Sequence, residues 1–378
     1  MRKLTDIMNE KKIRWGILST AEIGQKNWKA ILNSGNGVVT AVASRDGQKS
    51  REFIDRCQRE AAFDQAPEAL PNYEALLATK EVEAVYIPLP TGLREVWVLR
   101  AAQAGKHVVC EKPCAGSVAS LRKVLEVCRQ NRVQFMDGVM FMHSRRLERM
   151  REMVDDGHSV GQIKRIACGF SFGAPPEFFS RNIRANSELE PFGCLGDLGW
   201  YCIRFALWTM NFRLPQQITG RLLAEASGSG NRPVPTEFSG ELFFKGGVSA
   251  GFYCSFITEL QQWAHVSGTK GSLRVDDFVL PGHGSELTFE VNNPVYRITG
   301  CDFDMDPGTR RITVPEHSHG HASAQETNLF RNFGNQVRSG ELNEVWPEMA
   351  LKTQQVMEGC LASARRDGCA VELGNKAA

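Results

Sequence analysis

The stretch His107-Val-Val-Cys-Glu-Lys-Pro113 decides the fold class of this chain. Its first four residues, His107–Cys110, predict a short buried strand, because β-favouring residues follow Gly105 and a proline ends the run. Such a run fits a strand of a parallel sheet better than it fits a helix. A charged pair, Glu111-Lys112, stands where open α/β sheets place their ligands, at the carboxyl end of a strand. Lys112 is therefore the first candidate for chemistry.

Strands and helices alternate on both sides of this stretch. Further strands are predicted at Ile13–Leu18, Val38–Ser44, Ala84–Leu89 and Val133–Asp137, and helices from Gly24 to Asn33 and at Gln48–Gln58, Leu93–Ala104 and Leu121–Asn131. This alternation is typical of βαβ units in a parallel, doubly wound sheet. We therefore expect residues 1–140 to form an α/β dinucleotide-binding domain of the Rossmann type.

The pattern changes after residue 140. Consecutive strands are predicted at Ile163–Phe172, Gln217–Ala226, Glu237–Phe244, Val248–Ile257, Gln262–Val266, Ser272–Val275, Glu286–Val291 and Thr309–Val314. Strands without intervening helices indicate a largely antiparallel open sheet, so residues 141–378 are expected to form an α+β domain that binds substrate and drives oligomerisation. Helices are predicted at Gly196–Met210, Ala324–Ser339 and Pro347–Asp367, and the last two are expected to pack back on the first domain.

Composition excludes several classes of function. The 378 residues are 42% hydrophobic and 23% charged, as in a globular protein, and the net charge of +2 favours neither nucleic acid nor an anionic membrane. No apolar run is long enough to span a bilayer, and Met1–Lys12 has no hydrophobic signal region. The 11 cysteines, without a C-x-x-C pair, indicate reduced thiols. A cytoplasmic enzyme is expected.

The first βα turn is the usual place for a dinucleotide. The turn reads Ser19-Thr-Ala-Glu-Ile-Gly24, with Ser19, Ala21 and Gly24 in the places where the Rossmann fingerprint has its three glycines. About 20 residues later the second strand ends in Ser44-Arg45, where an acid would hold the ribose 2′-hydroxyl of NAD. A serine and an arginine suit a 2′-phosphate instead, so NADP is favoured and NAD is the alternative.

Several longer motifs resemble the Gfo/Idh/MocA family of oxidoreductases. They are Tyr86-Ile-Pro-Leu-Pro90, Ala101-Ala-Gln-Ala-Gly-Lys-His-Val-Val-Cys-Glu-Lys-Pro113, Phe192-Gly-Cys-Leu-Gly-Asp-Leu-Gly-Trp-Tyr201 and Gly268-Thr-Lys-Gly-Ser-Leu-Arg274. Met136-Asp-Gly138 and Gly-Trp-Tyr point to the branch related to glucose–fructose oxidoreductase and dimeric dihydrodiol dehydrogenase. The resemblance implies NAD(P)-dependent hydride transfer at a CH–OH group of a sugar, polyol or cyclic diol.

The resemblance also implies roles for single residues. Lys112 matches the catalytic lysine that touches both substrate and nicotinamide, and family members commonly have a cis peptide before the proline that follows it. The cofactor is then expected to contact Ser19, Ala21, Glu22, Ile23, Ser44, Arg45, Pro88, Leu89, Glu111, Lys112 and Pro113. Lys112, Arg184, Asp197 and Tyr201 are expected to bind substrate.

Asp197 and Tyr201 are spaced i, i+4 and so share one face of a helix. Most family members have histidine, the general acid/base, where this chain has Tyr201. Because a tyrosine has an ordinary pKa near 10, it needs a nearby cation such as Lys112 to accept a proton near neutral pH. The alternatives are that Tyr201 is a core residue of its helix and that Arg184 forms only a local salt bridge.

Other candidates carry less weight. Thr91 and Arg94 stand where the family often has asparagine and histidine, which puts the usual contacts of that loop in doubt. His143 is interpreted as structural, and His317, His319 and His321 as part of a polar loop rather than a metal site.

Two other readings compete with an NADP-dependent dehydrogenase. A dinucleotide-binding sensor without turnover would share the fold but would not need Lys112, Asp197 and Tyr201 together. An enzyme that cleaves glycosides with retained NAD would share the chemistry, although Ser44-Arg45 favours NADP. Because a sheet covered by helices on one face leaves the other face open, a homodimer or homotetramer is expected.

Overall fold

The computed structural model describes residues 12–373, which form two compact units. The first contains the chain up to His143 together with His319–Ala350, and the second contains Ser144–Ser318 and the chain from Leu351 onward. The expectation that the N-terminal segment is no secretory signal concerns residues outside the described range, apart from Lys12. Within that range no helix has the length and apolar character that a membrane span requires.

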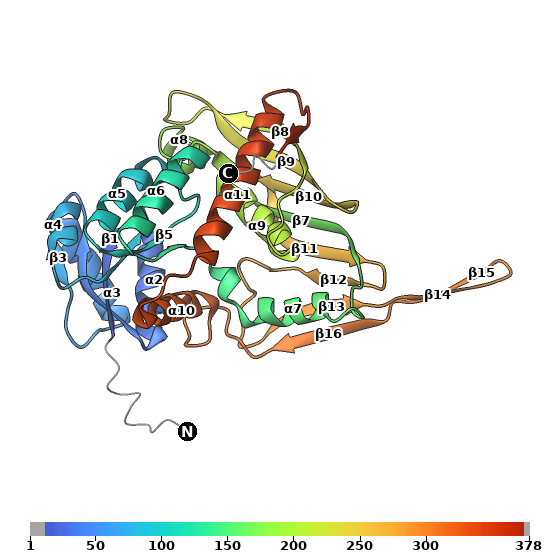
Figure 1. The fold of residues 1–378 in the computed structure, drawn as a ribbon, viewed down its shortest axis with the longest axis horizontal. Helices are drawn as coiled ribbons and strands as arrows, with labels where there is room; N and C mark the ends of the chain where they lie inside the picture. The colour runs from blue at the N-terminus through green and yellow to red at the C-terminus, as the bar shows by residue number, and fades with distance from the viewer. Residues whose placement is uncertain (1–11, 374–378) are drawn as a thin grey trace, which may run out of the picture. The chain divides into compact units, whose positions relative to one another are not determined.

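The first unit is built on a parallel sheet of six strands in the order β3-β2-β1-β4-β5-β6 (Figure 1). The strands are β1 (Ile13–Leu18), β2 (Gly37–Ala43), β3 (Glu68–Leu70), β4 (Ala84–Ile87), β5 (His107–Cys110) and β6 (Phe135–Asp137). Its helices are α2 (Glu22–Ser34), α3 (Gly47–Glu60), α4 (Tyr73–Ala78), α5 (Thr91–Gln103), α6 (Val118–Gln130), η1 (Met140–His143) and α10 (Gln325–Ser339). The doubly wound α/β domain predicted from the alternation is confirmed.

The core of this unit joins segments that are far apart in the sequence. Trp15 on β1 is fully buried, and its ring lies 5.1 Å from that of Phe330 and 5.3 Å from that of Phe333, both on α10. Helix α10 also packs along α2. This C-terminal helix therefore completes the hydrophobic core of the dinucleotide-binding fold.

The second unit is built on a mixed sheet of nine strands in the order β16-β13-β12-β11-β7-β10-β9-β8-β17. The strands are β7 (Ile163–Gly173), β8 (Gln217–Ala226), β9 (Val234–Phe244), β10 (Val248–Ser255), β11 (Ile257–Gly268), β12 (Ser272–Val275), β13 (Leu287–Asn292), β16 (Thr309–Val314) and β17 (Val371–Glu372). Strand β10 pairs in parallel with β7, and the other printed pairings of this sheet are antiparallel. The largely antiparallel sheet is confirmed.

Helices cover one face of the nine-stranded sheet. Every residue of α9 (Trp200–Thr209) is buried, and the helix packs on β7 and β10. The expected helix at Gly196–Met210 begins instead as a π-helical segment, η3 (Leu195–Gly199), which continues into α9. The remaining helices are α7 (Arg145–Asp155), α8 (Pro176–Arg181), η2 (Ile183–Ala185) and α11 (Val345–Ala364), which runs from the first unit into the second.

Several short or polar elements lie outside the predicted set. They are β3, α4, α7, α8, β17, the 3-10 segments η1 and η2, and a hairpin of β14 (Val295–Thr299) and β15 (Asp302–Asp306). Strand β3 has only three residues and α4 only six, so neither repeats its apolar pattern often enough to be recognised.

Candidate active site

The carboxyl end of β1 leads into the N-terminus of α2 through a tight turn. Ser19 has φ 143°, a value that few residues other than glycine adopt, and its Oγ accepts a hydrogen bond from the Ala21 amide at 3.0 Å. Helix α2 begins at Glu22 without a side-chain cap, so the first-turn amides, including those of Glu22 and Ile23, have no capping side chain. Such an N-terminus favours an anion such as a pyrophosphate.

Gly24 retains the packing role of the third glycine of the fingerprint. A Cβ at this position would lie 3.2 Å from the Phe53 ring on α3, so the missing side chain allows the two helices to approach. The small side chains of Ser19 and Ala21 thus suffice for the turn, whereas the packing position remains glycine.

Three consecutive residues at the end of β2 have three different roles. Ser44 is buried, and its Oγ accepts hydrogen bonds from the Asp46 amide at 3.1 Å and from the Ser50 hydroxyl at 3.2 Å. Asp46 caps α3 by accepting from the Gln48 amide at 2.9 Å. Arg45, in contrast, is exposed. The guanidinium of Arg45 is therefore the group at this strand end that can meet a 2′-phosphate.

The Glu111–Pro113 corner follows β5 directly. The peptide bond between Lys112 and Pro113 is cis, as the resemblance implied, and Lys112 is 8% exposed. The Tyr86 hydroxyl donates a hydrogen bond to Glu111 Oε1 at 2.7 Å. Burial and the neighbouring Glu111 carboxylate raise the pKa of Tyr86 well above its ordinary value, so Tyr86 remains a donor that fixes Glu111.

The same corner depends on a glycine of the next strand. Gly138, which follows β6, donates its amide to the Cys110 carbonyl at 2.8 Å. A Cβ at Gly138 would lie only 2.9 Å from Glu111 Oε1. The glycine of Met136-Asp-Gly138 thus makes room for the Glu111 side chain.

Strand β4 ends one position before Pro88, and both Pro88 and Leu89 are buried. Beyond them, Arg94 on α5 is 5% exposed and donates to Thr91 Oγ1 at 2.7 Å and to the Pro113 carbonyl. Arg94 is therefore a positioning residue, because its hydrogen bond to the Pro113 carbonyl holds the Lys112–Pro113 corner in place. Sequence reasoning noticed Thr91 and Arg94 only as departures from the family pattern.

Three polar side chains meet in the second unit. Arg184 Nε donates to Asp197 Oδ2 at 2.7 Å, which joins η2 to the π-helical segment. The Asp197 carboxylate is the main cause of a raised pKa for Arg184, and Tyr201 contributes in the same direction. Tyr201 is 9% exposed, and its ring lies 5.8 Å from that of Phe170. Arg184, Asp197 and Tyr201 thus form one electrostatic cluster.

The glycine-rich segment before Asp197 packs closely against another strand of the second unit. Gly193 has φ 48°, and a Cβ there would lie 2.1 Å from the Pro235 carbonyl oxygen. The missing side chain of Gly193 therefore allows the backbone to approach β9 closely. The π-helical segment that follows carries Asp197, and such segments are frequent at functional sites.

His143 contacts side chains of its own unit. His143 Nδ1 lies 3.1 Å from the side-chain amide nitrogen of Asn332, and the His143 ring packs edge-on against the ring of Trp346. These contacts are those of a structural histidine. Among residues 12–373, no three His, Cys, Asp or Glu side chains are grouped so that they could hold a metal ion.

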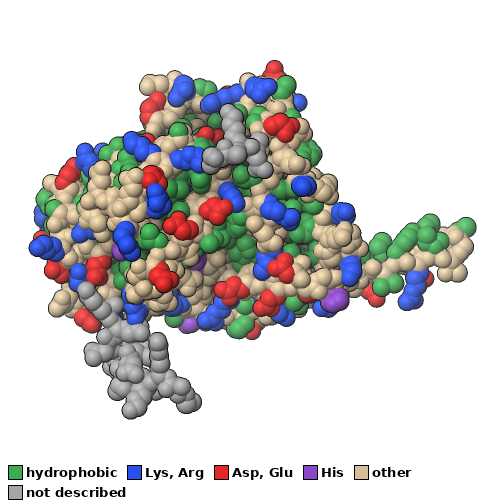
Figure 2. Space-filling view, viewed as in Figure 1, with side chains coloured by type: hydrophobic (Ala, Val, Ile, Leu, Met, Phe, Trp, Pro, Cys, Tyr) green, Lys and Arg blue, Asp and Glu red, His purple; other side chains and the backbone are tan. Residues whose placement is uncertain are grey.

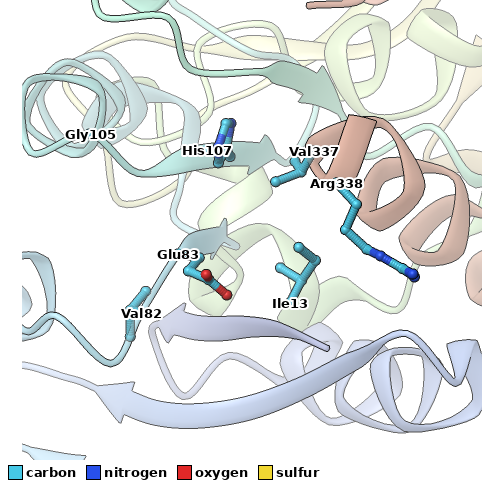
Figure 3. Close-up of a pocket in the computed structure, with 7 residues that line it drawn as sticks. All are labelled: Ile13, Val82, Glu83, Gly105, His107, Val337 and Arg338. Atoms are coloured by element: carbon cyan, nitrogen blue, oxygen red, sulfur yellow. The ribbon is translucent and has the colours of Figure 1, made fainter. Parts of the chain in front are cut away.

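A cavity of about 570 Å³ lies at the amino ends of β1 and β5, lined in part by Ile13, Glu83, His107 and Arg338 (Figure 3). His107 Nδ1 accepts a hydrogen bond from the Gln134 amide at 2.9 Å, and burial lowers its pKa. This is the opposite end of the strands from Ser19, Arg45 and Lys112, so the cavity is no part of the candidate cofactor site.

Comparison with protein families matches two consecutive segments of the chain. Residues 13–139 match a family described as "Oxidoreductase family, NAD-binding Rossmann fold", and residues 147–274 match the "GFO/IDH/MocA C-terminal domain".

Two relatives each cover more than four fifths of the chain. A D-xylose 1-dehydrogenase (NADP(+)) of Haloferax volcanii is 30% identical over 95% of this chain and 99% of its own length. A trans-1,2-dihydrobenzene-1,2-diol dehydrogenase of Mus musculus is 29% identical over 81% of this chain and 86% of its own length.

Solved structures share the fold. A 3-ketoreductase from Actinomadura kijaniata, in complex with NADP and TDP-benzene, has a TM-score of 0.76 at 23% identity and covers 93% of this chain and 98% of its own. An aldose-aldose oxidoreductase from Caulobacter crescentus, complexed with glycerol, has a TM-score of 0.77 at 19% identity and covers 96% of this chain and 100% of its own.

Proposed function

The chain belongs to the Gfo/Idh/MocA family of oxidoreductases, and from this premise we propose that it transfers a hydride between NADP and a CH–OH group of a sugar, a polyol or a cyclic diol. One observation carries the proposal. The order β2-β1-β4-β5 sets the carboxyl ends of four strands side by side, so Ser19, Arg45, Leu89 and Lys112 lie along one edge of a parallel sheet. Turnover with NADP and a panel of such substrates tests it.

The residues at this edge fit NADP. The N-terminus of α2, with Ala21, Glu22 and Ile23, suits the pyrophosphate, and the exposed Arg45 suits the 2′-phosphate. Pro88, Leu89, Glu111 and Pro113 line the rest of the edge as the proposed cofactor contacts, with Ser44 shaping the turn that presents Arg45. When bound, the cofactor supplies the hydride acceptor or donor.

The chain's own residues supply orientation and proton transfer. Lys112 holds the substrate hydroxyl at the carboxyl end of β5, and Tyr201 takes the hydroxyl proton during oxidation. Asp197, oriented by Arg184, binds a neighbouring substrate hydroxyl. Tyr201 is among the causes of the raised pKa of Arg184, so the two side chains are near enough to interact, and the Arg184 cation is proposed to assist Tyr201 in the proton transfer. In the reverse direction Tyr201 returns the proton.

Replacing Arg45 by alanine is expected to change cofactor choice. Loss of a charge-assisted contact of roughly 1.5–3 kcal/mol raises the dissociation constant for NADP by about 10- to 150-fold and leaves that for NAD nearly unchanged. Fluorescence titration of both cofactors measures this ratio.

Arg59→Ala, an exposed arginine near the other end of α3, is the matched control and should alter neither constant. Equal weakening of NAD and NADP in the Arg45 variant would show that Arg45 does not contact the 2′-phosphate.

We assign substrate binding and self-association to residues 141–378, and a second copy of this chain is the proposed partner, as a dimer or tetramer. Support for self-association comes from the nine-stranded sheet: α9 packs on one face, and on the other face Trp263, next to the buried Ala264, is only partly buried. Sedimentation of the purified protein tests self-association.

A cytoplasmic location is also proposed, because all 11 cysteines are free thiols. Fractionation of cells tests this location.

A further inference from the structure

A row of aromatic side chains leads away from Tyr201 within the second unit. The Tyr201 ring lies 5.8 Å from that of Phe170 on β7, and Phe172 follows two positions later on the same face of that strand. The Phe172 ring lies 5.8 Å from that of Phe178 on α8, which in turn lies 5.5 Å from that of Phe179. The row thus connects the candidate acid/base with α8.

The outer part of this row is open to solvent. Phe170 is 4% exposed, whereas Phe172, Phe178 and Phe179 are only half-buried. Helix α8, which carries the last two, has no buried residue. We call Phe172, Phe178 and Phe179 the apolar shelf. Partly exposed aromatic side chains next to a candidate site are typical of a surface that binds a ligand.

The apolar shelf is held in place by its own unit. The ring of Phe256, which is 1% exposed, lies 5.2 Å from that of Phe172 and 5.3 Å from that of Phe178. Gly228 lies in the loop after β8, and a Cβ there would lie 2.0 Å from the Ala185 carbonyl oxygen. This glycine therefore lets the loop pack directly on the backbone of η2, next to α8. The apolar shelf is a fixed surface before any ligand binds.

One short segment joins the apolar shelf to the polar cluster of Arg184, Asp197 and Tyr201. The Asn182 amide donates to the Phe178 carbonyl at 2.9 Å, and Asn182 Oδ1 accepts from the Arg184 amide at 3.0 Å. Arg184 Nε reaches Asp197 at 2.7 Å, while the Phe178 ring packs on Phe172. A ligand that contacts the polar cluster is therefore next to the apolar shelf.

The two parts of this surface suit two kinds of chemical group. A guanidinium, a carboxylate and a phenol together can bind several hydroxyl groups, as a sugar ring presents them, and the Arg184 and Asp197 side chains are 44% and 19% exposed. Phenylalanine side chains have no donor or acceptor, so the apolar shelf favours an apolar group over a second sugar ring. A free aldose would contact the polar cluster and leave the apolar shelf uncovered.

We propose that the substrate is a glycoside with an aromatic aglycone, whose sugar ring binds the polar cluster and whose aglycone lies on the apolar shelf. Oxidation converts one CH–OH of the sugar ring to C=O. The hydride passes to NADP, the hydroxyl proton passes to Tyr201, and the glycosidic bond stays intact. The inference rests on the proposed function, because the same polar cluster is proposed to bind the reacting hydroxyl.

Matched glycosides test the apolar shelf without turnover. The methyl and phenyl β-D-glucosides, β-D-xylosides and β-D-galactosides form three pairs that differ only in the aglycone. Calorimetric titration in the presence of NADPH measures binding alone, because the reduced cofactor cannot accept a hydride. We expect the phenyl glycoside of at least one sugar to bind about tenfold more tightly than its methyl partner.

Variants of the apolar shelf locate the preference. Phe178→Ala removes its central ring and should abolish the preference for phenyl glycosides while the affinity for methyl glycosides stays unchanged. Phe178→Tyr keeps a ring and should keep the preference. Phe303→Ala is the matched control: Phe303 lies on the hairpin of β14 and β15 and is 68% exposed, and Figure 2 shows apolar side chains along this hairpin. This control should bind as the wild type does.

Three binding results would overturn the proposal. They are the absence of a phenyl preference in all three pairs, a preference that survives in Phe178→Ala, and binding of cellobiose as tight as that of phenyl β-D-glucoside, which would assign the apolar shelf to a second sugar ring.

Turnover distinguishes the two proposals. NADPH formation without a phenyl preference would refute the role of the apolar shelf and leave the proposed function standing. A phenyl preference that Phe178→Ala abolishes, without NADPH formation from any glycoside and NADP, would support the apolar shelf and refute the proposed function.

Discussion

Replacing Lys112 by methionine is expected to lower kcat/KM by about 10²- to 10³-fold, the effect of removing one preorganised hydrogen-bond donor from the reacting oxygen. Methionine keeps the length of the side chain and removes only the charge and the donor. Because Lys112 is 8% exposed behind a corner fixed by Tyr86 and Arg94, the substitution should leave the backbone of that corner in place. Steady-state kinetics in both directions measure the effect.

Lys106, the residue directly before β5, provides the control. Its Nζ donates to the carbonyls of Thr79 at 2.7 Å and of Val82 at 2.9 Å, so Lys106→Met should lower the melting temperature while kcat stays near that of the wild type. Lys112→Met should instead lower kcat and leave the melting temperature near that of the wild type. Full turnover by Lys112→Met would exclude this lysine from the mechanism.

Replacing Tyr201 by phenylalanine is expected to lower kcat by about 10²- to 10⁴-fold, the usual contribution of a positioned general acid or base. The ring packs on Phe170 and is nearly buried, so phenylalanine should preserve folding and cofactor binding. Kinetics at saturating NADP separate this loss from any change in affinity. A variant with wild-type kcat would mean that Tyr201 is only a core residue of α9.

The pH profile tests how Tyr201 is tuned. Arg184 and Tyr201 interact electrostatically, and a cation beside a phenol favours its ionised form. If Tyr201 is the base, Arg184→Gln should therefore move the acid limb of the oxidation profile to higher pH. Arg184→Lys keeps the charge and should move the limb less. An acid limb that stays in place in the glutamine variant would leave Lys112 as the tuning cation.

The fold was predictable from the sequence because its pattern is repeated. Short apolar strands such as Ile13–Leu18 and Ser272–Val275 have the predicted bounds, since glycine, proline or polar residues end each run. The hairpin of β14 and β15 was missed, although Asp302-Phe-Asp-Met-Asp306 alternates apolar and acidic residues with the period of a strand. Its composition resembles a loop because no partner sheet buries it.

The site was predictable only in part. Motif spacing identifies Lys112, Asp197 and Tyr201 as candidates, but it does not show that Gly138 makes room for Glu111 or that Arg94 supports Pro113. These contacts join residues that are 19 or more positions apart in the chain. A single sequence carries no signal for such pairs, and their roles emerge only from the packing.

The central claim is that this protein moves a hydride between NADP and a CH–OH group. The most direct measurement is the absorbance of NADPH formed when the purified protein is mixed with NADP and each member of a panel of aldoses, polyols and dihydrodiols. We predict NADPH formation with at least one of these substrates, lost in Lys112→Met and in Tyr201→Phe. Tight binding of NADP without turnover of any substrate would contradict the claim and would favour a dinucleotide-binding sensor.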